Sequence, residues 1–278
     1  MPELPEVETI RRQLALTLPG RTVVDSWAFD HPKFTPASES VGGHIHEVRR
    51  RGKYLLIEIT RPDGPHELII HLGMTGQLRT EAAEPGGVGG VGGGPRDPYD
   101  RARFELDDGT VLAYRDVRRF GRIAWTPRGH YDGHPTLAAL GPEPFDHALD
   151  GAALWAALRG SRRAVKTQLL SQRPVAGVGN IYADEALWIA RVRPAARTVT
   201  RPQAVRLLEA IRSVLSAGIE HGGTTLRDYV DAQGRSGENQ HHLLCYGRGG
   251  KPCIRCGEPL RHGVLDGRGT TWCRTCQR

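Results

Sequence analysis

The sequence has 278 residues, of which 38% are hydrophobic and 25% are charged, and its formal net charge at pH 7 is +7. This length allows one large domain or two domains with separate cores, and the composition is ordinary for a soluble protein. No apolar run approaches the ~18–20 residues that span a bilayer, and the acidic start lacks the basic residues of a signal peptide. We therefore expect no membrane contact and a cytoplasmic, nucleoid-associated location.

Arginine supplies nearly all of the positive charge, and lysine is scarce. A guanidinium group presents a rigid fork of donors that suits phosphate oxygens, so a polyanionic partner would explain this bias. A GC-rich genome, which favours arginine codons, would also explain it, and the many alanines and glycines agree with that alternative.

The chain begins with two prolines and three acids among eight residues, Met1-Pro2-Glu3-Leu4-Pro5-Glu6-Val7-Glu8. Removal of the initiator methionine would leave Pro2 with a free secondary amine. An α-amine ordinarily has a pKa of roughly 8, so part of it is unprotonated and nucleophilic near neutral pH. Together with the carboxylates of Glu3 and Glu6, this amine suggests imine chemistry on a sugar or carbonyl carbon. Alternatively, Pro5 simply opens a helix whose positive end favours the acids.

The first half of the chain predicts one helix followed by short strands. Val7, Ile10, Leu14 and Leu18 recur at helical spacing, which predicts a helix over 5–18 that ends at Pro19-Gly20. Short β-runs separated by turns then continue to about residue 126 and predict an antiparallel sandwich or barrel. The clearest runs are Tyr54–Ile59, Glu67–Leu72, Ala102–Leu106, Val111–Tyr114 and Arg122–Trp125. The glycine-rich residues 83–98 predict a mobile loop without chemistry.

The second half predicts helices, after a boundary near 127–135. The helix candidates are Leu154–Leu158, Val165–Leu170, Asn180–Ala190 and Arg201–Ala217. The sequence Gly177-Val178-Gly179-Asn180 is typical of a tight turn into a helix N-terminus, which is a natural place to bind a phosphate.

Four of the five cysteines form two closely spaced pairs at the C-terminus: Cys253, Cys256, Cys273 and Cys276. Two C-x2-C pairs separated by sixteen residues predict a structural zinc ribbon, because four thiolates fill the tetrahedral coordination of one zinc ion. The stretch between the pairs predicts a β-hairpin whose turn, residues 266–269, carries Arg268. Cys245 lies outside this pattern, and we expect a small buried residue rather than a ligand.

Six segments resemble, in the same order, the motifs of formamidopyrimidine-DNA glycosylases, a family grouped with the endonuclease VIII-like enzymes. They are Met1–Thr9, 51–56, 71–76, 116–121, Gly177–Tyr182 and the terminal cysteine ribbon. The resemblance runs from residue 1 to residue 278. It implies an α+β fold with three domains: an N-terminal β-sandwich catalytic domain with a leading helix (1–130), a helix–two-turns–helix DNA-binding domain (131–240) and a zinc finger (241–278). It also implies a monomer that binds double-stranded DNA in the cleft between its lobes.

This resemblance further implies a base-excision-repair glycosylase that removes oxidised purines, 8-oxoguanine and formamidopyrimidines, and then cuts the strand by β- and δ-elimination. Pro2 would attack the sugar C1′ and displace the base, while Glu3 would protonate the sugar ring oxygen. Lys53 would assist β-elimination, and Arg268 would assist δ-elimination while binding phosphate. Taken without the family, Lys53 could equally be a surface lysine beside a strand, and Arg268 a simple turn arginine.

Several further residues match the family's DNA contacts. Met74, Arg118 and Phe120 match a wedge that fills the space left by the flipped base, although core packing is the ordinary role of such a methionine and phenylalanine. The matching phosphate contacts are His71, Arg162, Lys166 and Asn180, which would position DNA without reading its sequence. Glu6 and Glu185 resemble acids near the amine, and catalytic and positional roles are equally open for both.

The sequence departs from the family pattern at two places. Tyr99 stands where many members have a histidine, and its hydroxyl could still bind phosphate. In the lesion-covering loop, 227–245, Gly237 is followed by Glu238-Asn239-Gln240 where many members have an aromatic pair, so the ranking of lesions and the preference for the opposite base are not given by the sequence. Two other functions therefore remain: an endonuclease VIII-like glycosylase for oxidised pyrimidines, and a zinc-ribbon DNA-binding protein that has lost catalysis.

Overall fold

The computed structural model describes residues 2–82 and 95–278, and these residues form two compact units. Unit 1 comprises Met1–Ala138 and Gly222–Glu238, and unit 2 comprises Ala139–His221 and Asn239–Arg278. Most of the segment that we predicted as a glycine-rich loop (83–94 of 83–98), as well as Met1, lies outside the described residues. The three-domain division 1–130, 131–240 and 241–278 remains a prediction, and the compact units divide the chain at other residues.

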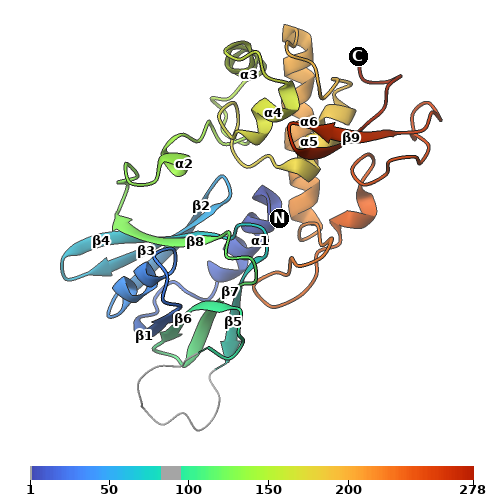
Figure 1. The fold of residues 1–278 in the computed structure, drawn as a ribbon. Helices are drawn as coiled ribbons and strands as arrows, with labels where there is room; N and C mark the ends of the chain where they lie inside the picture. The colour runs from blue at the N-terminus through green and yellow to red at the C-terminus, as the bar shows by residue number, and fades with distance from the viewer. Residues whose placement is uncertain (1, 83–94) are drawn as a thin grey trace. The chain divides into compact units, whose positions relative to one another are not determined.

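Unit 1 is a β-sandwich with a leading helix (Figure 1). Helix α1 spans Leu4–Leu14 and is followed by β1 (Val23–Ala28), η1 (Thr35–Ser40), β2 (His44–Arg51), β3 (Tyr54–Arg61), β4 (Gly64–His71), β5 (Gly76–Ala82), β6 (Asp100–Leu106), β7 (Thr110–Asp116), β8 (Arg122–Pro127) and α2 (Pro135–Ala138). The antiparallel strands form two four-stranded sheets, in the orders β1-β6-β7-β5 and β2-β3-β4-β8. All five strands predicted from the sequence are present.

One apolar core joins both sheets to α1. Val7 and Ile10 of α1 pack in the same buried cluster as Ile57 of β3 and Phe104 of β6, and each of these side chains is at most 1% exposed. Because burying this apolar surface is the main favourable contribution to folding, the sandwich fixes α1, and with it the N-terminus, against the sheets. Tyr229, from the distant part of unit 1, packs in the same core.

Helix α1 is shorter than the predicted span 5–18. It begins at Leu4 because Glu3 is its N-cap in a capping box with Glu6. Leu18 is completely buried and still donates its backbone N–H to the Leu14 carbonyl, so the predicted spacing identified the buried face although the regular helix had already ended.

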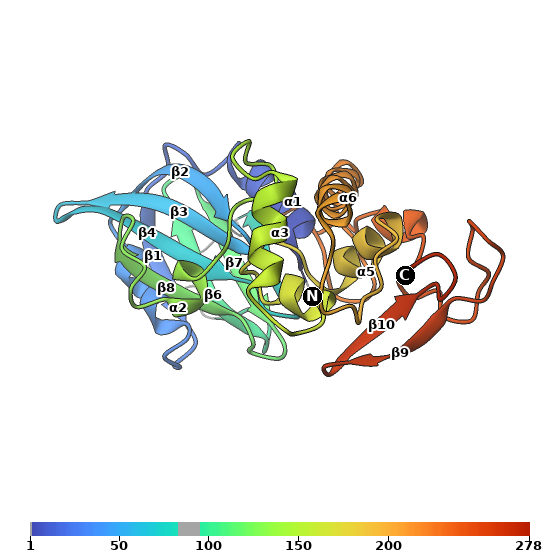
Figure 2. The ribbon, with the colours of Figure 1, turned by 90° about the horizontal axis from the view of Figure 1, so that it is seen from above.

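Unit 2 is helical and ends in a hairpin (Figure 2). Its elements are α3 (Gly151–Arg159), α4 (Val165–Leu170), α5 (Asn180–Ile189), α6 (Arg201–Glu220), η2 (Asn239–His242), β9 (Arg261–Leu265) and β10 (Arg268–Trp272). The four predicted helices are confirmed, and the α+β fold class with them. Helix α6 starts at a capping box formed by Thr200 and Gln203. None of the helices in the described residues is long and apolar enough to cross a membrane.

Candidate functional site

The N-terminus is anchored by the carboxylate of Glu6. Pro2 is buried, Glu3 is 1% exposed and Glu6 is fully buried. One oxygen of Glu6 accepts the backbone N–H of Glu3 and the other accepts the N–H of Thr224, both at 2.7 Å. Glu6 therefore binds the start of α1 to the segment 222–238, which supports its positional role.

The residues around Glu6 leave no space for larger side chains. Gly223 has a φ of +90°, and a Cβ on it would lie 3.0 Å from Cγ of Glu6 and 2.8 Å from the ring of Tyr229. The Tyr229 hydroxyl donates to the Gly222 carbonyl at 3.0 Å, and burial, together with the negative charge of Glu6, raises the pKa of Tyr229 well above its ordinary value. The tyrosine is therefore a permanent hydrogen-bond donor at this end of α1.

Lys53 lies in the tight turn between β2 and β3, and only 8% of it is exposed. Arg50 connects this turn to α1, since its Nε donates to Glu8 at 3.0 Å and its Nη1 to the Gly52 carbonyl at 2.9 Å. The alternative of an exposed surface lysine is therefore wrong. The structure holds the turn of Lys53 against the helix that follows Pro2.

His71, at the end of β4, is a neutral imidazole near physiological pH. Burial lowers its pKa to about 4, and the positive charges of Lys53 and Arg122 act in the same direction. Its Nδ1 accepts the backbone N–H of Gly73 at 3.3 Å, and its ring lies 4.7 Å from the ring of Tyr54. With Nδ1 used as an acceptor, the proton resides on Nε2, and this nitrogen is suited to donate to a phosphate oxygen.

The structure brings together the three residues predicted as a wedge. Met74 lies in the loop between β4 and β5, whereas Arg118 and Phe120 lie in the loop between β7 and β8. The Arg118 guanidinium stacks over the Phe120 ring at 4.5 Å, and its Nη1 lies 3.4 Å from the Met74 sulfur. Phe120 is 49% exposed and Met74 is half-buried, so the core-packing alternative is wrong for Phe120.

A buried aspartate, Asp116, fixes both wedge loops. It accepts the Thr75 hydroxyl at 2.6 Å and the Gly121 N–H at 2.8 Å, and it is 0% exposed. The two loops pass so closely that a Cβ on Gly73 would lie 2.4 Å from the backbone nitrogen of Gly121. Asp116 therefore holds the two wedge loops together through hydrogen bonds, a role that was not predicted from the sequence.

Tyr99 is 40% exposed. The Arg115 guanidinium stacks on its ring, with Cζ of Arg115 4.9 Å from the ring centroid. Its carbonyl accepts the backbone N–H of Asp116, so it lies beside the aspartate that supports the wedge. Its role in DNA binding remains a prediction.

The prediction that Lys166 contacts phosphate does not fit the structure. Its side chain is 1% exposed, and its ammonium lies 2.6 Å from Asp184, inside unit 2. Sequence reasoning missed this because the partner lies on another helix and Asp184 has no distinctive local pattern. Asn180 donates to the Gly269 carbonyl at 3.1 Å, and its contact with phosphate remains a prediction.

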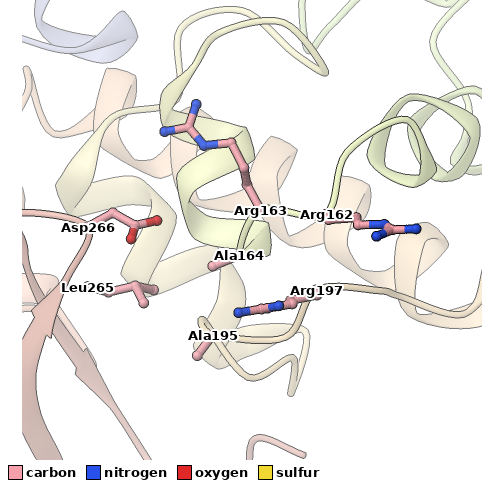
Figure 3. A pocket seen from close by; sticks show the side chains of 7 residues that line it. All are labelled: Arg162, Arg163, Ala164, Ala195, Arg197, Leu265 and Asp266. Atoms are coloured by element: carbon pink, nitrogen blue, oxygen red, sulfur yellow. The ribbon is translucent and has the colours of Figure 1, made fainter.

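Arg162 is exposed, as a phosphate contact must be, and it borders a pocket of about 620 Å³ in unit 2. The residues that line this pocket are Arg162, Arg163, Ala164, Ala195, Arg197, Leu265 and Asp266. Figure 3 shows Arg197 and Asp266 extending toward the middle of the pocket from opposite sides, whereas Arg162 extends away from it. The three arginines make this face of unit 2 suited to polyanions.

Arg268 is exposed at the first position of β10, opposite Leu265. The turn that precedes it has two residues, Asp266 and Gly267, with φ angles of +46° and +76°. Two successive positive φ angles define the type I′ turn that suits a two-residue hairpin. The predicted hairpin is thus confirmed, with a tighter turn than the expected 266–269.

The ribbon cysteines form a zinc site. The four sulfur atoms of Cys253, Cys256, Cys273 and Cys276 lie within 4.8 Å of one another. Tetrahedral coordination with zinc–sulfur bonds of about 2.3 Å places sulfurs about 3.8 Å apart, so the cluster fits one zinc ion. Cys245 is completely buried, lies outside this cluster and donates to the Thr271 carbonyl, which confirms that it is a small buried residue.

Removal of zinc should unfold the ribbon. Structural zinc contributes on the order of 10 kcal/mol to domains that cannot bury enough apolar surface alone. We expect Cys273→Ser to lose bound zinc and DNA strand cleavage together, measured by metal analysis and by gel assay. Cys245→Ser, the control, should retain one zinc per chain. A Cys273→Ser protein with full zinc and full cleavage would contradict the assignment.

Glu185 on α5 also has a positional role. Its carboxylate accepts the backbone N–H groups of Leu244, Cys245 and Tyr246 at 2.7–2.9 Å. Burial raises its pKa, although these three hydrogen bonds act against the shift. Glu185 therefore holds the segment that leads into the zinc ribbon.

These features define a class of protein: an α+β protein with a four-cysteine zinc finger, an arginine-rich face suited to polyanions and a buried Pro2 ahead of the first helix of a β-sandwich. Three family models match successive parts of the chain: the formamidopyrimidine-DNA glycosylase N-terminal domain at residues 1–123, the formamidopyrimidine-DNA glycosylase H2TH domain at 140–230, and the zinc finger found in FPG and IleRS at 250–278. The chain belongs to the formamidopyrimidine-DNA glycosylase family.

Relatives cover the whole chain. The formamidopyrimidine-DNA glycosylase of Deinococcus radiodurans is 42% identical over 100% of this chain and 97% of its own length. The crystal structure of the MutM (Fpg) protein of Thermus thermophilus is similar with a TM-score of 0.86 at 42% identity, covering 99% of this chain and 98% of that one. Lactococcus lactis Fpg in complex with DNA containing an abasic site has a TM-score of 0.85 at 32% identity, with both chains covered completely.

Proposed function

We propose that the protein is a base-excision-repair glycosylase and abasic-site lyase that removes oxidised purines from double-stranded DNA. The observation that carries this proposal is the buried N-terminal arrangement in unit 1, in which Pro2 and Glu3 directly precede α1 and the turn of Lys53 is bound to that helix through Arg50. An amine, a carboxyl group and a sheltered lysine are the groups that imine formation and elimination on a sugar require.

The reaction would proceed through a covalent link to Pro2. The Pro2 nitrogen attacks C1′, the bond from C1′ to the base breaks, and the base leaves with the bonding electrons and a proton. Glu3 donates a proton to the ring oxygen as the ring opens, which leaves an iminium ion at C1′. This cation accepts electrons in the next steps.

Two eliminations then release the strand. Loss of a C2′ proton, which Lys53 assists, breaks the bond from C3′ to its oxygen and releases the phosphate on that side. Loss of a C4′ proton breaks the bond from C5′ to its oxygen, and Arg268 stabilises the charge on the departing phosphate. Water then hydrolyses the imine and restores the amine of Pro2.

DNA is the partner that these groups require. His71, Arg162, Asn180 and Arg268 would bind the backbone, Tyr99 would add a hydroxyl, and Met74, Arg118 and Phe120 would fill the space of the flipped base. We also propose that the protein acts as a monomer without membrane contact, in the cytoplasm at the nucleoid.

A panel of lesions tests the substrate class. Duplexes with 8-oxoguanine or formamidopyrimidine opposite cytosine should be cleaved faster than a thymine glycol duplex of the same sequence. A strong preference for thymine glycol would instead support the endonuclease VIII-like alternative, and binding without cleavage of any duplex would support a non-catalytic DNA-binding protein.

The wedge provides a second test. Phe120→Ala should slow excision from duplex DNA about tenfold or more, because unstacking a base costs a few kcal/mol that the ring partly offsets. Arg118→Ala should weaken the preference for cytosine opposite the lesion. Phe145→Ala, which removes another exposed phenylalanine, is the matched control for single-turnover excision. Equal rates for Phe120→Ala and the unaltered protein would exclude Phe120 from the wedge.

A further inference from the structure

The hairpin of Arg268 is bound by side chains from α4 and α5. The Lys166 ammonium donates to the Gly269 carbonyl and to the Thr270 hydroxyl, both at 2.9 Å. Asn180 donates to the same Gly269 carbonyl at 3.1 Å. Two helices thus bind the carbonyl group of Gly269, the residue that directly follows Arg268.

Asp184 completes this attachment from α5. Its carboxylate accepts the Thr271 backbone N–H at 2.8 Å and pairs with the Lys166 ammonium at 2.6 Å. The Lys166 and Asp184 side chains are 1% and 0% exposed. The Lys166 ammonium thus contacts Asp184 of α5 as well as Gly269 and Thr270 of the hairpin.

The hairpin is also attached to α4 at a residue that precedes Arg268. The Thr167 hydroxyl donates to the Asp266 carboxylate at 2.5 Å, and Asp266 is the first residue of the type I′ turn. Helix α4 therefore contacts the hairpin before Arg268 through Thr167 and after it through Lys166. The Arg268 side chain itself remains exposed between these two contacts.

A buried ion pair is a costly way to stabilise a fold, because both charges lose their hydration, and apolar residues of similar volume often stabilise as well. Compared with apolar packing, a buried ion pair that also makes hydrogen bonds fixes the orientation of its partners, because each donor requires an acceptor at a defined angle and distance. Here the acceptors belong to the strand that begins with Arg268. The charges thus fix the place of that strand relative to α4 and α5.

We propose that Lys166, Asp184 and Thr167 are positioning residues for Arg268, and that they hold its guanidinium where the phosphate departs during δ-elimination. The proposal rests on the proposed function of Arg268. It replaces the direct phosphate contact predicted for Lys166 with an action through the hairpin. A displacement of about 1 Å in such a group can slow a step about a hundredfold.

The test measures the ratio of β-elimination product to β,δ-elimination product on DNA with an abasic site. Thr167→Val removes one hydrogen bond at nearly constant volume. The double variant Lys166→Met with Asp184→Leu removes both buried charges and so avoids an unpaired one. In both variants we expect the β-product to rise about tenfold relative to the β,δ-product. Zinc content, and borohydride trapping on Pro2 at saturating DNA, should stay within about twofold, because Arg268 does not bind the metal and saturation compensates for a weaker phosphate contact.

The controls separate this proposal from the role of Arg268 itself. Arg268→Ala should shift the product ratio most, and Lys251→Met, at an exposed lysine of the same ribbon, should not shift it. If Arg268→Ala leaves the ratio unchanged, the proposed function of Arg268 is wrong. If Arg268→Ala shifts the ratio while the folded, zinc-loaded Thr167→Val and double variants do not, the positioning role is overturned.

Discussion

A chain that retains Met1 should form at least about 10³-fold less covalent adduct at Pro2 with abasic-site DNA than the same chain after methionine removal. In the precursor the Pro2 nitrogen is part of a peptide bond, and resonance with the carbonyl removes its nucleophilic lone pair. The measurement is borohydride trapping, with peptide mapping to locate the adduct and mass spectrometry to follow the loss of methionine.

The matched control is the same preparation before and after treatment with methionine aminopeptidase, because only the N-terminus then differs. Adduct yield should rise in proportion to the fraction of chains that begin at Pro2. Pro2→Gly keeps an amine but makes it primary, so trapping should persist at a lower rate. An adduct that maps to another residue, or one whose rate does not respond to Pro2→Gly, would show that Pro2 is not the nucleophile.

The features that the sequence predicted correctly depend on residues close together in the chain. Two C-x2-C pairs place four thiolates around one metal through local turns alone, and the hairpin between them follows from the Asp266-Gly267 turn. The strands and helices were also predicted from local periodicity, with errors at their ends. Helix α1 ends at Leu14 rather than at residue 18.

The features that the sequence did not predict depend on contacts between different elements, which no spacing pattern in the chain specifies. Lys166 has the sequence context of a surface cation, but its partner Asp184 is buried on another helix, and the pair directs the ammonium into unit 2. The segment 222–238 follows α6 in the chain but is bound to unit 1, where Thr224 donates to Glu6 and Ala232 accepts from Thr80. No local pattern indicates a partner more than 100 residues away.

This arrangement gives Glu6 and Glu185 the same kind of task in the two units. Each carboxylate accepts backbone N–H groups from a segment distant in sequence, Glu6 from Thr224 and Glu185 from residues 244–246. Both carboxylates therefore hold backbone segments in place, which is a positioning role. Glu3, which directly follows Pro2, is the acid that we propose for proton transfer.

Glu3→Gln should separate base removal from lyase activity. A glutamine side chain cannot donate a carboxylic proton to the sugar ring oxygen, so excision of 8-oxoguanine should slow by about 10²–10⁴-fold, the usual contribution of a general acid. A pre-formed abasic site is partly an open-chain aldehyde, which the Pro2 amine can attack without ring protonation. Borohydride trapping on abasic DNA should therefore decrease much less than excision in single-turnover assays on matched duplexes.

Glu6→Gln is the matched control, because it makes the same chemical change one helical turn further along α1. Its amide can accept only one of the two N–H groups that Glu6 now accepts, and its NH2 group would face the other. An unsatisfied buried donor costs about 1–3 kcal/mol, so this variant should show a lower melting temperature and a parallel loss of excision and trapping. Glu3→Gln should instead keep the melting temperature of the unaltered protein, and its rate of excision should fall far more than its borohydride trapping. If excision and trapping fell equally in Glu3→Gln, Glu3 would be acting on the position of Pro2 rather than on the sugar ring oxygen.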